Sequence, residues 1–318
     1  MSFVAAKWLK NPHLQTVWPH FFRRVSRPPL NHERLELSDG DFLDLFSAQS
    51  VTKPKGHMCL FHGLEGSINS SYMRGMMWRL LNDGYRVSAL HFRSTNGVPN
   101  RLARAYHSGE TGDIRYVLNL LSNRYPNVPL GAMGVSLGGN ALLVYLGEEK
   151  EASPLVVAVA VSAPIDLADS ALRISKGLSF LYQKRFLRNL RKTVQSKKSL
   201  LEALNIDVQN GLDAENFYQF DDVITAPLHG FTGAADYYFR ASACRKLHKI
   251  MVPTLMLQSA DDPLLGPFCM PDPDQVSSAI EIETTERGGH VGFVYGAPWG
   301  PKFYIEDRTM TFIKSFFE

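Results

Sequence analysis

The segment from Gly134 to Gly138 reads Gly-Val-Ser-Leu-Gly, and its G-x-S-x-G spacing is typical of a serine nucleophile held on a sharp turn. Such a turn brings its flanking residues into close contact, so the positions two residues before and after the serine must be small. The residues before the motif favour a strand and those after it favour a helix, which is the context that the motif requires. Ser136 is therefore the candidate nucleophile.

A serine hydroxyl reacts when a base removes its proton, and the base in turn needs an acid that orients it. In a strand–turn–helix context the expected chain order is serine, acid, histidine. Three histidines follow Ser136, namely His229, His248 and His290. Only His290 comes just after a predicted strand, where open α/β sheets place their active sites. His290 is therefore the candidate base.

The acid is expected in the loop that follows the predicted strand over residues 252–258. Two adjacent carboxylates, Asp261 and Asp262, lie in this loop. Asp262 leads an Asp-Pro-Leu-Leu run, which favours it as the catalytic acid. Asp261 would then form the turn or support the site, and it remains the alternative acid.

Negative charge on a substrate carbonyl oxygen needs backbone N–H donors close by. Leu137, the residue after the candidate nucleophile, supplies one amide, and the loop after the third predicted strand supplies the other. That loop begins His62-Gly63-Leu64, so Leu64 and Leu137 are the candidate oxyanion-hole residues. His62 and Gly63 are expected to contact the substrate. A glycine loop that leads into a helix is the plainer interpretation, and it is compatible with the same role.

The elements that must position these residues follow from the alternation of short apolar runs with longer segments of helical period. This alternation predicts an α/β fold with a mostly parallel eight-stranded sheet flanked by helices on both faces. The predicted strands are 34–37, 42–48, 57–61, 85–91, 129–135, 155–162, 252–258 and 279–284. The predicted helices are 71–82, 112–123, 137–146 and 236–247.

Residues 166–226 interrupt this alternation. A structureless loop of such length is uncommon in a compact domain, and the leucines and phenylalanines between residues 178 and 190 favour helices. We therefore predict a single domain over residues 1–318, with residues 1–30 as an N-terminal arm. Residues 166–226 are predicted to form a helical cap over the carboxyl edge of the sheet.

Composition narrows the class of protein. The 318 residues include 34 Lys and Arg against 31 Asp and Glu, a net charge of +3, which argues against nucleic acid as the main partner. Three widely spaced cysteines favour a reducing compartment over a disulfide framework. Lys7 and Lys10 interrupt any signal-peptide core, and no apolar run reaches the ~18–20 residues that span a bilayer. A cytoplasmic protein is expected.

Several further segments resemble one known family. They are Asn11-Pro12-His13-Leu14-Gln15-Thr16, the His62–Ser67 loop, Tyr106-His107-Ser108-Gly109-Glu110-Thr111 followed by Asp113, the run from Asp221 through Asp236-Tyr237-Tyr238 and Ser242 to Asp262, and Gly288–Phe293. Together they resemble the YheT-like branch of the α/β-hydrolase superfamily, which is related to eukaryotic α/β-hydrolase-domain esterases and phospholipases. The resemblance covers nearly the whole chain. It implies an α/β-hydrolase fold with Ser136, Asp262 and His290 as the triad.

One segment departs from the family pattern. Where relatives tend to read Phe-Arg-Gly-Cys-Ser-Gly, residues 92–97 of this chain read Phe-Arg-Ser-Thr-Asn-Gly. Pocket contacts at Asn96 and its neighbours are therefore expected to differ from those of relatives.

A basic stretch between Ser170 and Lys198 holds nine Lys and Arg residues and no acidic one, with Phe186, Leu187 and Leu190 between them. A basic amphipathic helix of this kind can lie on an anionic membrane surface. The alternative is a solvated cap face whose apolar side covers the active site. We favour the solvated face, and peripheral membrane contact remains the second interpretation.

Metal and nucleotide motifs are not found in the sequence, so no cofactor and no metal are expected. His107 and Asp113 are interpreted as part of a loop that supports the serine site. The expected activity is hydrolysis of short- to medium-chain carboxylic esters, including lipid esters, through an acyl-enzyme, with a small-molecule ester as substrate. An acyltransferase or thioesterase with the same triad is one alternative, and a non-catalytic protein that binds lipids or small molecules is the other.

Overall fold

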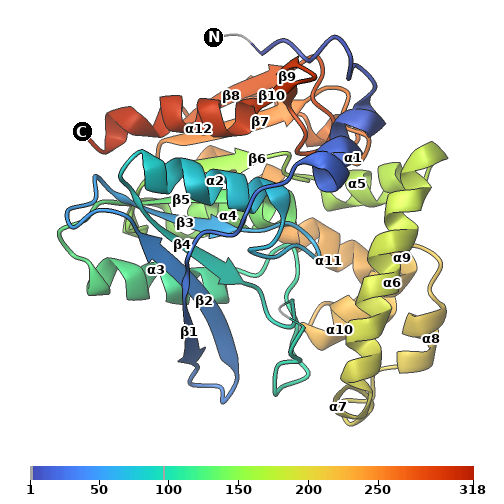
Figure 1. Ribbon diagram of the computed structural model, residues 1–318. Helices are drawn as coiled ribbons and strands as arrows, with labels where there is room; N and C mark the ends of the chain where they lie inside the picture. Colours follow the sequence, from blue (N-terminus) through green and yellow to red (C-terminus); the bar gives the residue numbers. More distant parts are fainter. Residues whose placement is uncertain (1–2, 96) are drawn as a thin grey trace.

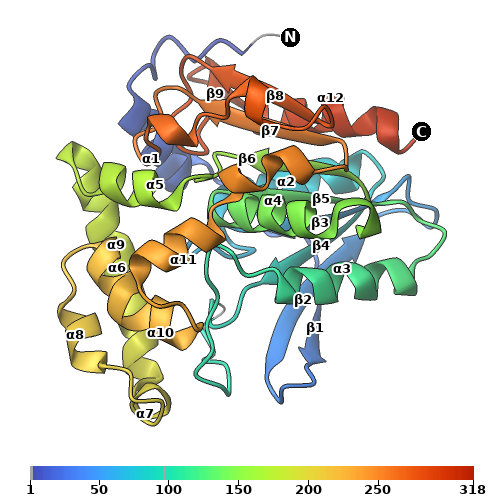
Figure 2. The same cartoon turned by 180° about the vertical axis from the view of Figure 1, so that it is seen from behind.

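The computed structural model describes residues 3–95 and 97–318. Its main sheet has the strand order β1-β2-β4-β3-β5-β6-β7-β8 (Figures 1 and 2). β1 and β2 pair antiparallel, as do β2 and β4, and the remaining neighbours are parallel. The strands are β1 (Asn31–Glu36), β2 (Phe42–Gln49), β3 (His57–Phe61), β4 (Arg86–His91), β5 (Leu130–Val135), β6 (Leu155–Val161), β7 (Thr254–Ser259) and β8 (Ile280–Thr285). The predicted fold class is confirmed.

Helices cover both faces of this sheet, because successive residues of a strand point to opposite sides. Cys59 and Phe61 of β3 pack under α3 (Gly112–Arg124) and α4 (Leu137–Glu149), whereas Met58 and Leu60 pack under α2 (Ser71–Asn82) and α12 (Tyr304–Ile313). Figures 1 and 2 show these two helical layers from opposite sides. The central strands are therefore buried on both faces, which explains their continuous apolar runs.

Two helices and one small sheet lie outside the predicted set. Helix α1 (Pro12–Phe22) contains Pro19, which hides its helical pattern in the sequence. The side chain of Asn11 caps it by accepting hydrogen bonds from the amides of His13 and Leu14. α12 packs against the sheet, and β9 (Val294–Ala297) pairs antiparallel with β10 (Gly300–Phe303).

The helix predicted over residues 236–247 is shorter than expected and begins earlier. Helix α11 (Ala234–Ala241) ends where Ser242 takes an extended conformation, and two 3₁₀ turns, Ala243–Arg245 and Leu247–Lys249, follow it. The Ser242 hydroxyl donates to the Tyr238 carbonyl and accepts from the Leu167 amide. These side-chain bonds stop the helix in a way that periodicity alone does not indicate.

The chain between β6 and β7 is mostly helical. Its elements are α5 (Leu167–Ile174), α6 (Phe180–Ser196), α7 (Lys198–Glu202), α8 (Val208–Asp213), α9 (Phe217–Phe220), a π-helical segment (Asp221–Thr225) and α10 (Ala226–Leu228). Leu187, Val194 and Leu201 pack with Phe220 and Ile224 in a small core of their own. These helices stand beside the carboxyl ends of the central strands (Figure 1).

Helix α6 carries most of the basic stretch, and its apolar side faces inward. Leu187 and Val194 are buried, whereas Lys184, Arg185 and Arg188 are exposed. Lys197 at its end is buried and donates to the carbonyls of Leu102 and Arg104, so it does not belong to the exposed basic face. Leu181 of the same helix is exposed beside these basic side chains, so the solvated face and peripheral membrane contact both stay predictions. Among the described residues, no helix combines the length and apolarity that crossing a bilayer would need.

Candidate active site

Ser136 lies on the turn between β5 and α4, with φ 52° and ψ −121°. A non-glycine residue at positive φ is strained, and such strain persists only where the surroundings enforce it. The flanking glycines make the turn fit, because a Cβ on Gly138 would lie 2.5 Å from the carbonyl oxygen of His62. A Cβ on Gly134 would overlap the backbone of Gly138. The steric requirement expected for the G-x-S-x-G motif is therefore met.

His290 lies in hydrogen-bond contact with this serine, and Asp262 in hydrogen-bond contact with His290. The Nε2 atom of His290 is 2.9 Å from Oγ of Ser136, and its Nδ1 atom is 2.8 Å from Oδ2 of Asp262. Asp262 is buried, and its Oδ1 atom accepts from the amide of Leu264 at 2.8 Å. An acid that orients an imidazole needs this fixed, buried geometry.

The neighbouring carboxylate, Asp261, points elsewhere. It accepts hydrogen bonds from the Ser259 hydroxyl at 2.7 Å and from the amide of Gly289 at 2.9 Å. Asp261 thus ties the end of β7 to the loop that carries His290. The structure brings Asp262, and not Asp261, to the imidazole.

The two candidate oxyanion residues lie close to Ser136. Leu137 begins α4, and Leu64 follows Gly63, whose Cβ would come within 3.1 Å of Cβ of Ser136. In the described part of the chain, neither the Leu64 amide nor the Leu137 amide donates to a protein acceptor. Both side chains also line the cavity above the serine.

His62 does not contact the cavity, contrary to the expectation that it binds substrate. Its ring is fully buried, Nδ1 donates to the Gly63 carbonyl at 2.8 Å, and Nε2 accepts from the amide of Phe92 at 3.3 Å. Burial lowers the pKa of His62 to about 3, so the ring is neutral. His62 instead braces the backbone before Leu64. Gly63 is likewise absent from the cavity wall.

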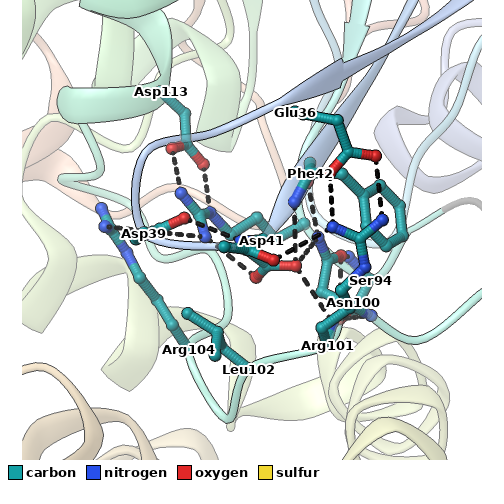
Figure 3. A network of polar contacts seen from close by, with 12 residues as sticks. Glu36, Asp39, Asp41, Phe42, Ser94, Asn100, Arg101, Leu102, Arg104 and Asp113 are labelled. Atoms are coloured by element: carbon teal, nitrogen blue, oxygen red, sulfur yellow. Dashed lines mark hydrogen bonds and ion pairs between the residues drawn. The ribbon is translucent and has the colours of Figure 1, made fainter.

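A buried ion-pair network holds the loop after β4, which provides the Phe92 amide (Figure 3). The guanidinium of Arg93 binds both carboxylate oxygens of Asp113 at 2.8 Å and one oxygen of Asp41 at 2.9 Å. These charge-assisted hydrogen bonds raise the pKa of Arg93, against the lowering effect of burial, and keep it charged. Asp113, in the first turn of α3, thus holds the loop after β4 through Arg93. That His107 and Asp113 support the serine site stays a prediction. Asn96, in the segment that departs from the family pattern, lies outside the described residues.

Helix α1 positions the loop of His290, a role that the sequence did not reveal. The amide of His290 donates to Oγ1 of Thr16 at 2.9 Å, and Gln15 bonds the backbone of Val294 through both its amide atoms. Gly289, at φ 59°, lets the loop approach the Pro12 carbonyl, where a Cβ would lie 2.5 Å away. The Asn-Pro pair that starts α1 was the available signal, because it is typical of a helix N-terminus.

Replacing Thr16 with valine should lower kcat by roughly ten- to a hundredfold, because the His290 amide loses its acceptor and the imidazole shifts from its position. Thr16→Ser keeps the hydroxyl and should retain most activity. Both variants can be compared by ester hydrolysis, with thermal unfolding measured alongside. A valine variant as active as the wild type would show that α1 does not position His290.

The cavity above Ser136 has a volume of about 140 Å³. A dry protein cavity of roughly 150 Å³ holds one benzene-sized group, so the space suits a small substrate portion. Phe186 and Leu190 of α6 and Phe217 of α9 line it, together with Leu264 and Leu265. Polar side chains line it as well; besides Ser136 and His290 they are Tyr106, His107, Ser108, Ser170, Asp221, Thr225, Tyr237 and Tyr238.

His107, Glu110 and His229 are the one group of described residues with ligand atoms close enough to hold a metal ion, all within 4.8 Å of one another. Their hydrogen bonds do not fit that role. Nδ1 of His107 accepts from the amide of Gly109 at 3.1 Å, which leaves the proton of the neutral ring on Nε2. The guanidinium of Arg104 already binds Oε2 of Glu110 at 2.8 Å.

Comparison with known proteins places this geometry in context. The family model described as alpha/beta hydrolase fold matches residues 56–297. The YheT protein of Escherichia coli (strain K12) is 38% identical over 323 residues, which cover 100% of this chain and 94% of that protein.

A monoacylglycerol lipase of Saccharomyces cerevisiae is 31% identical over 262 residues, which cover 79% of this chain and 58% of the lipase. Among solved structures, the Pyrococcus furiosus esterase Pf2001 superposes with a TM-score of 0.58 and 17% identity, covering 99% of this chain and 98% of that one. At that identity the likeness concerns the fold alone.

Proposed function

This chain belongs to the alpha/beta-hydrolase family, in the branch that contains YheT, and from that membership we propose that it is a serine esterase for small carboxylic esters. The observation that carries the proposal is the continuous hydrogen-bonded chain from Ser136 through His290 to Asp262, at 2.9 and 2.8 Å. Relatives named as a lipase and a phospholipase support the same class of reaction, cleavage of an ester bond.

In the proposed mechanism, Ser136 Oγ attacks the ester carbonyl while His290 Nε2 takes its proton. Asp262 accepts the hydrogen bond from Nδ1–H, which fixes the tautomer and stabilises the imidazolium. His290 then gives the proton to the leaving alcohol, and an acyl-enzyme remains on Ser136. Water attacks this acyl group by the same steps in reverse, which releases the acid and regenerates the serine.

The amides of Leu64 and Leu137 hold the oxyanion that forms in both steps. Removing one such donor costs about 3 kcal/mol of transition-state stabilisation in comparable enzymes. His62 bonds the Gly63 carbonyl and the Phe92 amide, and the Arg93 network holds the loop of Phe92, so the chain before Leu64 is in position before the substrate binds. Every step uses protein groups and water, and no cofactor takes part.

Residues 166–226 act as the cap in this proposal, and their side chains set which esters enter. Phe186, Leu190 and Phe217 from this segment line the cavity of about 140 Å³, so acyl chains of a few carbons fit best. Longer chains would need the cap helices to move apart.

A series of p-nitrophenyl esters with acyl chains of increasing length tests the proposed function. We expect the highest kcat/KM for short acyl chains, a steep fall as the chain outgrows the cavity, and complete loss of activity after labelling with a fluorophosphonate. A protein that neither hydrolyses any ester of the series nor reacts with the fluorophosphonate would refute the proposal. Such a protein would carry an aligned triad that only binds its ligand.

A further inference from the structure

Asp221 is a carboxylate in the wall of the proposed substrate cavity that the mechanism above does not use. It begins the π-helical segment Asp221–Thr225, in the part of the chain that closes over Ser136. Short π-helical segments are uncommon and are frequent at functional sites. The residue also opens the run up to Asp262 that resembles the family pattern.

Two hydroxyl groups hold this carboxylate. Oδ1 accepts from Thr225 Oγ1 at 2.6 Å, and Oδ2 accepts from the Tyr238 hydroxyl at 2.8 Å. An ionised carboxylate has about four acceptor positions, so each oxygen of Asp221 keeps one that these bonds do not fill. The single side-chain oxygen of an asparagine could also accept from two hydroxyl groups. Holding Thr225 and Tyr238 in place therefore does not by itself require a carboxylate at this position.

The charge of Asp221 has no counter-ion. Within residues 3–95 and 97–318, no Lys, Arg or His forms an ion pair with it. Burial raises the pKa of Asp221 to about 6, although both hydrogen bonds act to lower it. A half-buried carboxylate among aromatic and apolar side chains is costly to desolvate further, unless a donor reaches it when the cavity fills.

The surroundings of Asp221 indicate which donor fits. Its neighbours in the cavity wall are the aromatic residues Phe217, Phe220, Tyr237 and Tyr238 and the apolar side chains of α6. The hydroxyl of Tyr237 already accepts from the amide of Ser108, and that of Tyr238 donates to Asp221. Asp221 is the one carboxylate among the described residues that line the cavity, so its acceptor positions are the strongest acceptors that a substrate group could use in this part of the wall. A neutral hydroxyl can enter so apolar a space more easily than a hydrated ion can.

We propose that Asp221 is a specificity-determining residue that accepts a hydrogen bond from a free hydroxyl group of the substrate, so the preferred substrates are hydroxylated esters. This inference rests on the proposed function, because it concerns the same cavity and the same reaction. Asp221 does not touch the reacting atoms. It selects which esters reach Ser136 in a productive position.

Two pairs of esters test the proposal, each pair matched in size and differing by one hydroxyl group. Hydroxyethyl butyrate against propyl butyrate places the hydroxyl on the alcohol side. Ethyl ω-hydroxyhexanoate against ethyl heptanoate places it on the acyl side. For at least one pair, the wild type should prefer the hydroxylated ester by about tenfold or more in kcat/KM, the size expected for a hydrogen bond to a charged acceptor.

Asp221→Asn should reduce that preference to about threefold or less, because the neutral amide is a weaker acceptor than the carboxylate. Its kcat/KM for the ester without the hydroxyl should change much less. Asp222→Asn is the matched control, since Asp222 is exposed and binds the amide of Ala234 through an oxygen that asparagine retains. This control should keep the full hydroxyl preference.

The outcomes separate this inference from the proposed function. If the wild type hydrolyses both members of both pairs equally, Asp221 does not select hydroxyl groups, and the esterase proposal stands. If Asp221→Asn slows all esters by the same factor, its role is structural and the inference fails. A preference for butyrylcholine over its neutral carbon isostere would also overturn it, because the wall would then select a cation. If no ester of either pair is hydrolysed, both proposals fall.

Discussion

Replacing Ser136 with alanine is expected to lower kcat for ester hydrolysis by about 10⁶-fold, the size of effect seen when a triad nucleophile is removed. Alanine keeps the Cβ atom, so the backbone at φ 52° experiences the same strain and the turn between β5 and α4 should not change. The variant should therefore unfold at nearly the wild-type temperature. The measurements are steady-state hydrolysis of a p-nitrophenyl ester and thermal unfolding by circular dichroism.

Ser170→Ala is the matched control, because Ser170 is another serine in the wall of the same cavity. Its hydroxyl lies 3.1 Å from Sγ of Cys269 and forms no hydrogen bond with His290. This variant should keep most of the activity and still react with a fluorophosphonate, whereas Ser136→Ala should not react. Equal activity of the wild type and Ser136→Ala would rule out the proposed mechanism. A large loss in both variants would indicate that the cavity wall had rearranged.

The sheet could be predicted from the sequence because its central strands are buried on both faces. β3, β5 and β6 carry continuous apolar runs with turn residues at their ends, so local pattern and tertiary environment agree. The prediction of the edge strand β1 was less accurate. β1 begins at Asn31, three residues before the predicted start at residue 34, because pairing of Asn31 with Ser47 extends a polar segment that has no apolar pattern.

The residues around Ser136 could be predicted to the extent that they follow strand ends. Ser136 follows β5, Asp262 comes soon after β7, and His290 comes soon after β8, so the topology of a parallel sheet brings them to one edge. Their catalytic roles stay predictions. The supporting groups could not be found in this way, because Thr16 lies 274 positions from His290 in the chain and meets it only through the tertiary fold.

His62 illustrates why residue type near a site is a weak guide to its role. Its position beside Gly63 and Leu64 suggested a contact with substrate, yet the ring turns inward and bonds the Phe92 amide. Side-chain direction depends on the packing of β4 against β3, and one sequence does not show it. The same holds for Lys197, which the sequence groups with exposed basic residues and the structure buries against the Leu102 and Arg104 carbonyls.

Asp262→Asn should lower kcat by about 10⁴-fold, whereas Asp261→Asn should lower it far less. Asparagine at position 262 can donate to Nδ1 of His290, which favours the tautomer that carries its proton on Nε2 and so cannot accept the proton of Ser136. Asparagine at position 261 can still accept from the Gly289 amide with its one carbonyl oxygen, so the loop of His290 should keep its place. The two substitutions are chemically identical and adjacent in the chain, so each serves as the control for the other.

The measurement is kcat for the same ester at several pH values, with the unfolding temperature of each variant recorded. A loss confined to Asp262→Asn would assign the orienting role to the carboxylate that lies 2.8 Å from the imidazole. The reverse pattern, with Asp261→Asn inactive and Asp262→Asn active, would require the loop after β7 to rearrange when substrate binds. Equal and small losses in both would mean that His290 works without an orienting acid. The tautomer of His290 would then depend only on how its ring is placed. The hydrogen bond from the His290 amide to Thr16 fixes the backbone of that residue and not its ring.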